Sequence, residues 1–158
     1  MITTTGNKSE MVVGYATLYG DMAGGFDVLK DVPKTLVFRL CEYRNTIGHV
    51  IPPRVIDRPP SAVLAPTRRA RILPPYPVLD EILRLYIEEN VSADAITEQG
   101  FDEEIVRKVI RLVDLNEYSK RRQVAVGPRM IGRGFGAFRN PVDSAFSLGS
   151  IMFAQLAI

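Results

Sequence analysis

The sequence predicts an α/β fold that is mostly helical over this chain. Two observations support this class. A β-branched run at the amino end stops at a glycine and passes into helical spacing, as in a strand, turn and helix. Later segments repeat apolar residues at the spacing of amphipathic helices. With 158 residues, 46% of them hydrophobic, the chain can bury the core of one domain. The composition excludes disordered, collagen-like and disulfide-rich proteins.

The first element is a short strand over residues 1–5 that ends at Gly6. Helical spacing then runs from Lys8 to Tyr19, and Gly20 is expected to end that helix. A second helix is expected to start at Asp31, which would cap it, with Pro33 in the first turn. The apolar stripe predicted to be buried on this second helix comprises Leu36, Val37, Leu40 and Cys41.

Seven prolines between residues 52 and 76 exclude a long helix there, and residues 54–56 are expected to form a short edge strand. Three helices should follow, over residues 77–90, 92–98 and 102–118. Their predicted core positions are Leu79, Ile82, Leu83, Tyr86, Ile105, Val106, Val109, Ile110 and Val113.

The last two helices, joined at Gly100, resemble a helix-turn-helix. Asp102, Glu103 and Glu104 would repel DNA at the position that reads bases, so nucleic acid is an unfavoured partner. A basic cluster at residues 119–123 comes just past the predicted helix end. It fits a cation patch at a helix carboxyl terminus and a phosphate clamp equally well.

The net charge of +2 is unevenly distributed, with positive ends around an acidic middle over residues 77–118. This pattern suits ends that handle phosphates, although a solvated acidic helix face also explains it. Cys41 is the only cysteine and no signal peptide is visible, which indicates a cytoplasmic protein. The uncharged run over residues 144–158 is shorter than a membrane span needs, so no membrane partner is expected.

Residues 5–25, Thr-Gly-Asn-Lys-Ser-Glu-Met-Val-Val-Gly-Tyr-Ala-Thr-Leu-Tyr-Gly-Asp-Met-Ala-Gly-Gly, and residues 28–35 resemble the synthetase domain of glutamine-dependent NAD synthase. Further matches follow in the same order at residues 51–56, 60–62, 73–76, 100–104, 116–118 and 120–123. The resemblance implies the carboxyl-terminal half of a Rossmann-like fold of the adenine-nucleotide α-hydrolase type. That domain would occupy residues 1–136, and residues 137–158 would be an unmatched apolar tail.

The implied reaction is amidation of deamido-NAD: ATP adenylates its nicotinate carboxylate, and ammonia then displaces AMP to give NAD. ATP and Mg²⁺ are the implied cofactors, and the intact family enzyme would be a homo-oligomer. By resemblance the ATP-binding residues are Thr5, Lys34 and Ser61, and the metal-binding residue is Glu10. The residues implied to bind deamido-NAD are Glu10, Tyr15, Ala16, Thr17, Leu18 and Lys120.

Each of these residues also has a purely structural explanation. Thr5 could cap a helix, and Glu10 and Lys34 could be exposed surface charges. Tyr15 and Leu18 could be core residues. No residue is assigned a catalytic role from the sequence.

The chain departs from the family pattern at several points. It contains no Ser-Gly-Gly-x-Asp-Ser run to hold pyrophosphate, no glutaminase domain, and Val63 where a glutamate is usual. Ser119 looks inserted before Lys120. The chain is therefore expected to be a truncated piece with little activity alone, whose partner is the missing amino-terminal portion. The alternative is a non-catalytic binding module that uses the basic residues of 68–71 and 120–122.

Overall fold

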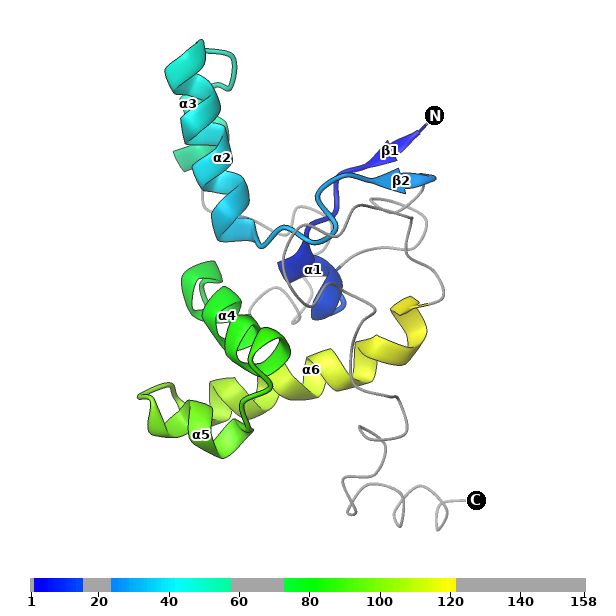
Figure 1. The fold of residues 1–158 in the computed structure, drawn as a ribbon, viewed down its shortest axis with the longest axis vertical. Helices are drawn as coiled ribbons and strands as arrows, with labels where there is room; N and C mark the ends of the chain where they lie inside the picture. The colour runs from blue at the N-terminus through cyan, green and yellow to red at the C-terminus, as the bar shows by residue number, and fades with distance from the viewer. Residues whose placement is uncertain (1, 16–23, 58–72, 122–158) are drawn as a thin grey trace.

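A computed structural model of the chain describes residues 2–15, 24–57 and 73–121, with residues 117–121 described by their backbone only. The described part is mostly helical with a small parallel sheet (Figure 1). In chain order its elements are β1 (Thr3–Thr4), α1 (Lys8–Val12), β2 (Phe26–Asp27), α2 (Lys34–Ile47), α3 (Pro53–Asp57), α4 (Tyr76–Leu83), the π-helical turn η2 (Arg84–Glu88), α5 (Ala93–Glu98) and α6 (Glu103–Arg121).

The predicted strand, turn and helix at the amino end are confirmed, although each element is shorter than expected. β1 pairs in parallel with β2, with Thr3 opposite Phe26 and Thr4 opposite Asp27. β2 has only two residues, too few to show an alternating pattern in the sequence. The chain passes from β1 through a short turn into α1, so the first residues of α1 lie just beyond the carboxyl end of the strand (Figure 1).

The helix predicted over residues 8–19 ends at Val12 instead. Gly14 follows with φ of +81°, a conformation that glycine adopts without strain. The Tyr15 N–H donates to the Glu10 carbonyl at 2.8 Å, and the Gly14 N–H donates to the Met11 carbonyl at 3.3 Å. This pair of bonds is the Schellman arrangement that closes helices, and the glycine in the middle of the predicted helix was its signal.

The end of α1 is also held from the far end of the described chain. Asn116, in α6, donates from Nδ2 to the carbonyls of Val13 at 3.2 Å and Leu112 at 2.6 Å. A Cβ added to Gly14 would lie 2.2 Å from Oδ1 of Asn116. The close approach of α6 to α1 therefore needs a glycine at this position.

Helix α2 corrects two predictions. Asp31 does not cap it, because Pro33 occupies the N-cap position, and buried Asp31 forms an ion pair with Lys8 at 3.2 Å instead. The predicted stripe over residues 36–41 is not buried either: no residue of α2 is buried, and Leu40 is 46% exposed. Only the first part of α2 meets α1 and α4, and the rest extends away from the other helices (Figure 1), so Leu36, Val37 and Cys41 are half-buried.

The edge strand predicted over residues 54–56 is wrong, because these residues lie in helix α3. Proline is favourable in the first turn of a helix, where its missing N–H would have no partner. Here Pro53 begins the helix, and the Val55 N–H donates to the Pro52 carbonyl at 2.9 Å.

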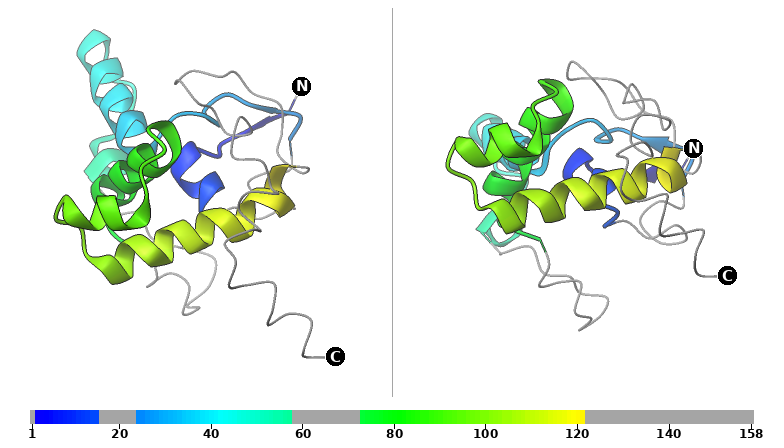
Figure 2. Two further views of the ribbon diagram at one scale, coloured as in Figure 1. Left: turned by 60° about the horizontal axis from the view of Figure 1, so that its bottom comes forward. Right: turned by 90° about the horizontal axis from the view of Figure 1, so that it is seen from below.

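The core lies between α1, α4, η2, α5 and α6, which pack together in both views of Figure 2. The predicted helices over 77–90, 92–98 and 102–118 are confirmed, with the first one widening into a π-helical turn after Leu83. The buried members of the predicted core are Leu79, Ile82, Leu83, Tyr86, Val106, Val109 and Val113, whereas Ile105 and Ile110 are half-buried.

Helix α6 continues three residues beyond the predicted end, through Arg121. Ser119, Lys120 and Arg121 therefore belong to its last turn and do not follow the helix. Within the described ranges, no helix is both long enough and apolar enough to span a membrane.

Candidate functional site

Three consecutive residues of α1 face polar partners on α4 and η2. We call these six residues the polar seam. Its pairs run in opposite directions along the two segments: Glu10 with Tyr76, Ser9 with Asp80, and Lys8 with Glu88. Buried or half-buried polar atoms are costly unless they are paired, so the seam requires α1 and α4 to adopt one relative register.

Glu10 is paired with one cationic and one polar side chain. Its Oε1 lies 3.0 Å from Nζ of Lys34 and accepts a hydrogen bond from the Tyr76 hydroxyl at 3.2 Å. Among the described residues no bond reaches its other oxygen, Oε2. The side chains of Glu10 and Lys34 are 20% and 22% exposed, so the pair is accessible to a ligand. Within the described part of the chain, the carboxylate therefore has one oxygen paired and one oxygen without a partner.

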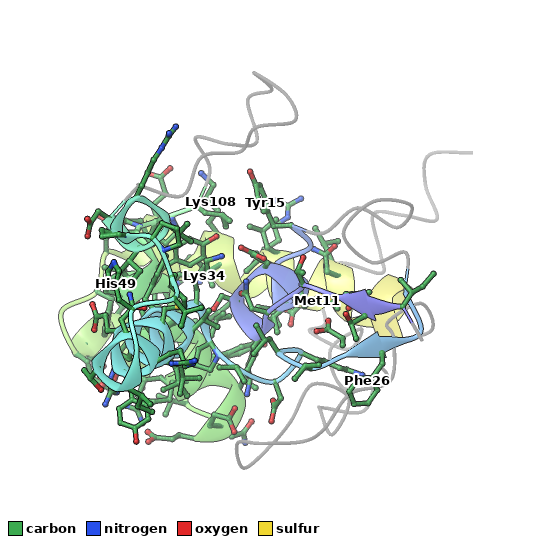
Figure 3. All side chains as sticks on the ribbon, turned by 90° about the horizontal axis from the view of Figure 1, so that it is seen from above. Met11, Tyr15, Phe26, Lys34, His49 and Lys108 are labelled. Atoms are coloured by element: carbon green, nitrogen blue, oxygen red, sulfur yellow. The ribbon has the colours of Figure 1, made fainter. Side chains whose placement is uncertain are left out.

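The ammonium of Lys34 lies near two aromatic rings. Its Nζ is 5.7 Å from the centre of the Phe38 ring and 5.8 Å from the centre of the Tyr76 ring. Both distances are within the range of cation–π attraction. Lys34 is the first residue of α2, and in Figure 3 it lies on the side of that helix toward α1.

Burial raises the pKa of the Tyr76 phenol, and the negative charge of Glu10 and its hydrogen bond raise it further. Tyr15 and Asp80 add to the same effect. The phenol consequently stays protonated at neutral pH and remains a hydrogen-bond donor to Glu10.

The middle pair of the seam caps α2. The Ser9 hydroxyl donates to Oδ1 of Asp80 and accepts from the Lys34 N–H at 2.8 Å. The other oxygen of Asp80 accepts from the Thr35 N–H at 2.9 Å. Two of the free N–H groups at the start of α2 are thus satisfied by α1 and α4, in place of a side chain from the preceding loop.

Lys8 is buried and carries a positive charge, and it contacts two carboxylates, Asp31 and Glu88. The backbone N–H of Lys8 donates to the Val32 carbonyl at 2.9 Å. Glu88 is the last residue of the π-helical turn η2. This cluster ties together α1, the loop before α2, and η2.

A cavity of about 340 Å³ borders the seam. It is lined by Lys8, Ser9, Pro33, Thr35, Pro77, Asp80, Glu81, Leu83, Arg84 and Glu88. Glu10, Lys34 and Tyr76 do not line it, so it is distinct from the cluster around Glu10.

The structure brings Glu10 and Lys34 together, although they are 24 positions apart. Thr5 is exposed and follows the end of β1, and Asn7 rather than Thr5 caps α1 by accepting from the Glu10 N–H at 3.1 Å. Tyr15 is half-buried against the core, in keeping with its structural explanation.

The other predicted site residues are not placed with this cluster. Ala16, Thr17, Leu18 and Ser61 lie outside the described residues. Lys120 is described by its backbone only, within α6.

Sequence reasoning missed Tyr76, Ser9 and Asp80. Tyr76 stands in the Pro-Pro-Tyr-Pro entry to α4, and Ser9 stands directly before Glu10, so both are adjacent to features that the sequence does mark. No local pattern signals Asp80, because its partners are 71 and 45 positions away.

In the Glu10 cluster, the carboxylate of Glu10 is the one group of a kind that binds magnesium. Mg²⁺ in phosphate-transferring sites is held by one or two carboxylates together with substrate phosphates and water. Within residues 2–15, 24–57 and 73–121, no group of three or more His, Cys, Asp or Glu side chains could hold a metal ion by itself. Oε2 of Glu10 can supply one ligand, and phosphate oxygens would have to supply others.

Comparison with known proteins gives a consistent result. The family model for NAD synthase matches residues 1–124. The glutamine-dependent NAD(+) synthetase of Acinetobacter baylyi is 59% identical over 142 residues, which cover 88% of this chain and 26% of that protein.

Two solved structures are also similar. The glutamine-dependent NAD(+) synthetase of Cytophaga hutchinsonii matches with a TM-score of 0.63 and 28% identity, over 89% of this chain and 24% of that one. The Acinetobacter baumannii enzyme in complex with ADP matches with a TM-score of 0.41 and 54% identity, over 87% and 24%. The chain spans about a quarter of the length of the relatives that it matches.

Proposed function

The chain belongs to the NAD synthase family, and from this premise we propose that it supplies part of a site for ATP-dependent amidation of deamido-NAD to NAD. In this proposal the chain is the carboxyl-terminal half of a Rossmann-like adenine-nucleotide α-hydrolase fold. The observation that carries it is the cluster of Glu10, Lys34 and Tyr76 just beyond the carboxyl end of β1. Ligands of open α/β sheets bind at that edge.

The residues have defined roles in the proposed site. The ammonium of Lys34 would contact ATP phosphate, because a lysine acts as a point charge toward phosphate oxygens. Oε2 of Glu10 would be a ligand of Mg²⁺, which when bound neutralises charge on the leaving pyrophosphate. Thr5 and Ser61 would be further ATP contacts. The dinucleotide would contact Glu10, residues 15–18 and Lys120.

The remaining machinery would come from elsewhere. The chain has no Ser-Gly-Gly-x-Asp-Ser run, and backbone N–H groups in such a loop stabilise phosphate charge. We therefore propose a partner, the amino-terminal synthetase and glutaminase portion of the enzyme, and a cytoplasmic, homo-oligomeric assembly. Removing such groups costs several kcal/mol of transition-state stabilisation, so the chain alone should be nearly inactive.

The test is NAD formation from deamido-NAD, ATP and ammonium. We expect no NAD from the purified chain, and NAD when the portion of the Acinetobacter baylyi relative that precedes the matched region is added. Glu10→Gln should abolish the restored activity, because it removes the anionic metal ligand. Glu42→Gln, a matched change at an exposed residue of α2, should not affect it. Restored activity that survives Glu10→Gln would contradict the proposed site, and failure of complementation would contradict the proposed partnership.

A further inference from the structure

Tyr76 contacts both charged members of the Glu10 cluster, yet it was not among the residues that the sequence pointed to. Its hydroxyl donates to Oε1 of Glu10 at 3.2 Å, and its ring faces Nζ of Lys34 at 5.8 Å. Glu10 comes from α1 and Lys34 from α2, whereas Tyr76 begins α4. One side chain thus touches residues from two other elements.

We propose that Tyr76 is a positioning residue, whose hydroxyl holds Oε1 of Glu10 so that Oε2 is presented to a divalent cation, while its ring holds the Lys34 ammonium for an anionic ligand. The inference rests on the proposed function, which assigns the cation to Glu10 and phosphate to Lys34. The inference adds Tyr76 as the residue that fixes the positions of the Glu10 carboxylate and the Lys34 ammonium.

The surroundings of Tyr76 suit such a role. Pro75 and Pro77 flank it, and proline restricts the backbone at the helix entry. The Pro75 carbonyl accepts from the N–H groups of Val78 at 3.0 Å and Leu79 at 2.9 Å, which closes the first turn. The Tyr76 ring packs against the core through its apolar part. Because the backbone and the ring of Tyr76 are both restricted, its hydroxyl has few alternative positions.

The chemistry of the contact also separates this role from simple packing. A core position would accept phenylalanine, whereas this hydroxyl is a donor to a carboxylate oxygen. A hydrogen bond to a charged acceptor is stronger than one between neutral groups. Both bonds that described residues make to Glu10 converge on Oε1, so the torsion of the carboxylate is fixed while Oε2 is left for a ligand.

The two halves of the inference can be separated by substitution. Tyr76→Phe removes the hydroxyl and keeps the ring, whereas Tyr76→Leu removes both. Phe38→Leu removes the other ring at Lys34 and leaves the hydroxyl in place. Tyr43→Phe is the matched control, because it removes a hydroxyl from an exposed tyrosine of α2.

The experiment uses the full chain with two probes, Mn²⁺ followed by electron paramagnetic resonance and inorganic pyrophosphate followed by calorimetry. In Tyr76→Phe we expect Mn²⁺ binding to weaken about tenfold and pyrophosphate binding to be unchanged. In Phe38→Leu we expect Mn²⁺ binding to be unchanged and pyrophosphate binding to weaken by about two- to fivefold. Tyr76→Leu should weaken both, and Tyr43→Phe neither. Thermal unfolding of each variant accounts for any loss of folded protein.

Mn²⁺ binding by Tyr76→Phe equal to wild type, while Glu10→Gln weakens it, would overturn the inference and leave the proposed function standing. Mn²⁺ binding that is unaffected by Glu10→Gln would overturn the metal role of Glu10 and with it both proposals.

Discussion

Asp27 is a carboxylic acid with almost no contact with solvent, at 1% exposure. Burial raises its pKa above the ordinary value of 3.8, and the Leu29 N–H that donates to it at 3.2 Å only partly opposes this effect. The side chain sits at the end of β2, where a Cβ on Gly6 would lie 2.9 Å from its Oδ2. The two strand ends therefore meet at a carboxyl group that is poorly hydrated.

This burial makes a prediction about pH. The folded chain binds the Asp27 proton more tightly than the unfolded chain, so its contribution to stability is present below pH about 4 and is lost as the pH rises through the folded pKa. Asp27→Asn should remove that loss, since the amide keeps an acceptor for the Leu29 N–H. The measurement is urea unfolding of both proteins at several pH values between 3 and 7. A stability difference that does not change with pH would contradict the prediction.

Substitutions at three glycines can distinguish the cost of backbone strain from the cost of a steric clash. Gly14 has φ of +81° and lies against Asn116, Gly100 has φ of +97° with open space around it, and Gly25 has neither constraint. We expect Gly100→Ala to lower the free energy of unfolding by about 1–2 kcal/mol. Gly14→Ala should cost roughly 1–2 kcal/mol more, because Asn116 must move and lose its bonds to the ends of α1 and its own helix.

Gly25→Ala is the control and should be within about 0.5 kcal/mol of wild type. Chemical denaturation of the three variants measures the differences. Equal losses at Gly14 and Gly100 would show that the contact with Asn116 carries no stability.

At the scale of elements, α2 depends on other helices for its start. A helix leaves its first N–H groups unpaired, and here Ser9 and Asp80 accept from Lys34 and Thr35. The same bonds fix where the Lys34 backbone stands relative to α1 and α4. The polar seam therefore links the stability of α2 to the geometry of the candidate site.

Removing this cap should destabilise the chain measurably. Asp80→Ala leaves the Thr35 N–H and the Ser9 hydroxyl without their acceptor, and we expect a loss of about 1–3 kcal/mol. Glu81→Ala, the neighbouring residue, removes only ion pairs to the exposed Arg84 and should cost less than about 1 kcal/mol. Amide hydrogen exchange at the start of α2 would locate the effect. Protection there that is unchanged in Asp80→Ala would contradict the capping role.

Taken together, the described residues form a packed part and a projecting part. The core joins α1, α4, η2, α5 and α6, whereas α2 and α3 extend from it with large apolar residues exposed (Figure 1). The exposed apolar residues of that projecting part are Leu40, Tyr43, Ile47, Val50 and Val55.

This division predicts very different costs for similar truncations. Ile82→Ala, at a fully buried position, should lower the free energy of unfolding by about 2–5 kcal/mol. Leu40→Ala should change it by no more than about 0.5 kcal/mol, because its side chain is already 46% exposed. Thermal unfolding of the two variants checks both values. A large loss in Leu40→Ala would mean that α2 packs against a surface in solution.

Features that depend on neighbours within a few positions could be predicted from the sequence. Ser92 accepts from the Ala95 N–H and Asp102 from the Ile105 N–H, and both helix starts were predicted correctly. The stripes of α4 and α6 were recognised because apolar spacing marks which face of a helix is available for burial. The family was also readable, because its motifs are contiguous runs of residues.

What packs against each helix face could be seen only in the folded structure. Apolar spacing on α2 could not reveal that, among the described residues, its stripe is only half covered. Asp31 was predicted to cap α2, whereas Asp80, 45 positions from Thr35, accepts from the Thr35 N–H. The pairing of Tyr76 with Glu10 spans 66 positions. The short chain between neighbouring residues restricts which hydrogen bonds they can form, so a local pattern can predict these bonds. Distant residues become partners because of how whole elements pack, and a local pattern does not contain that information.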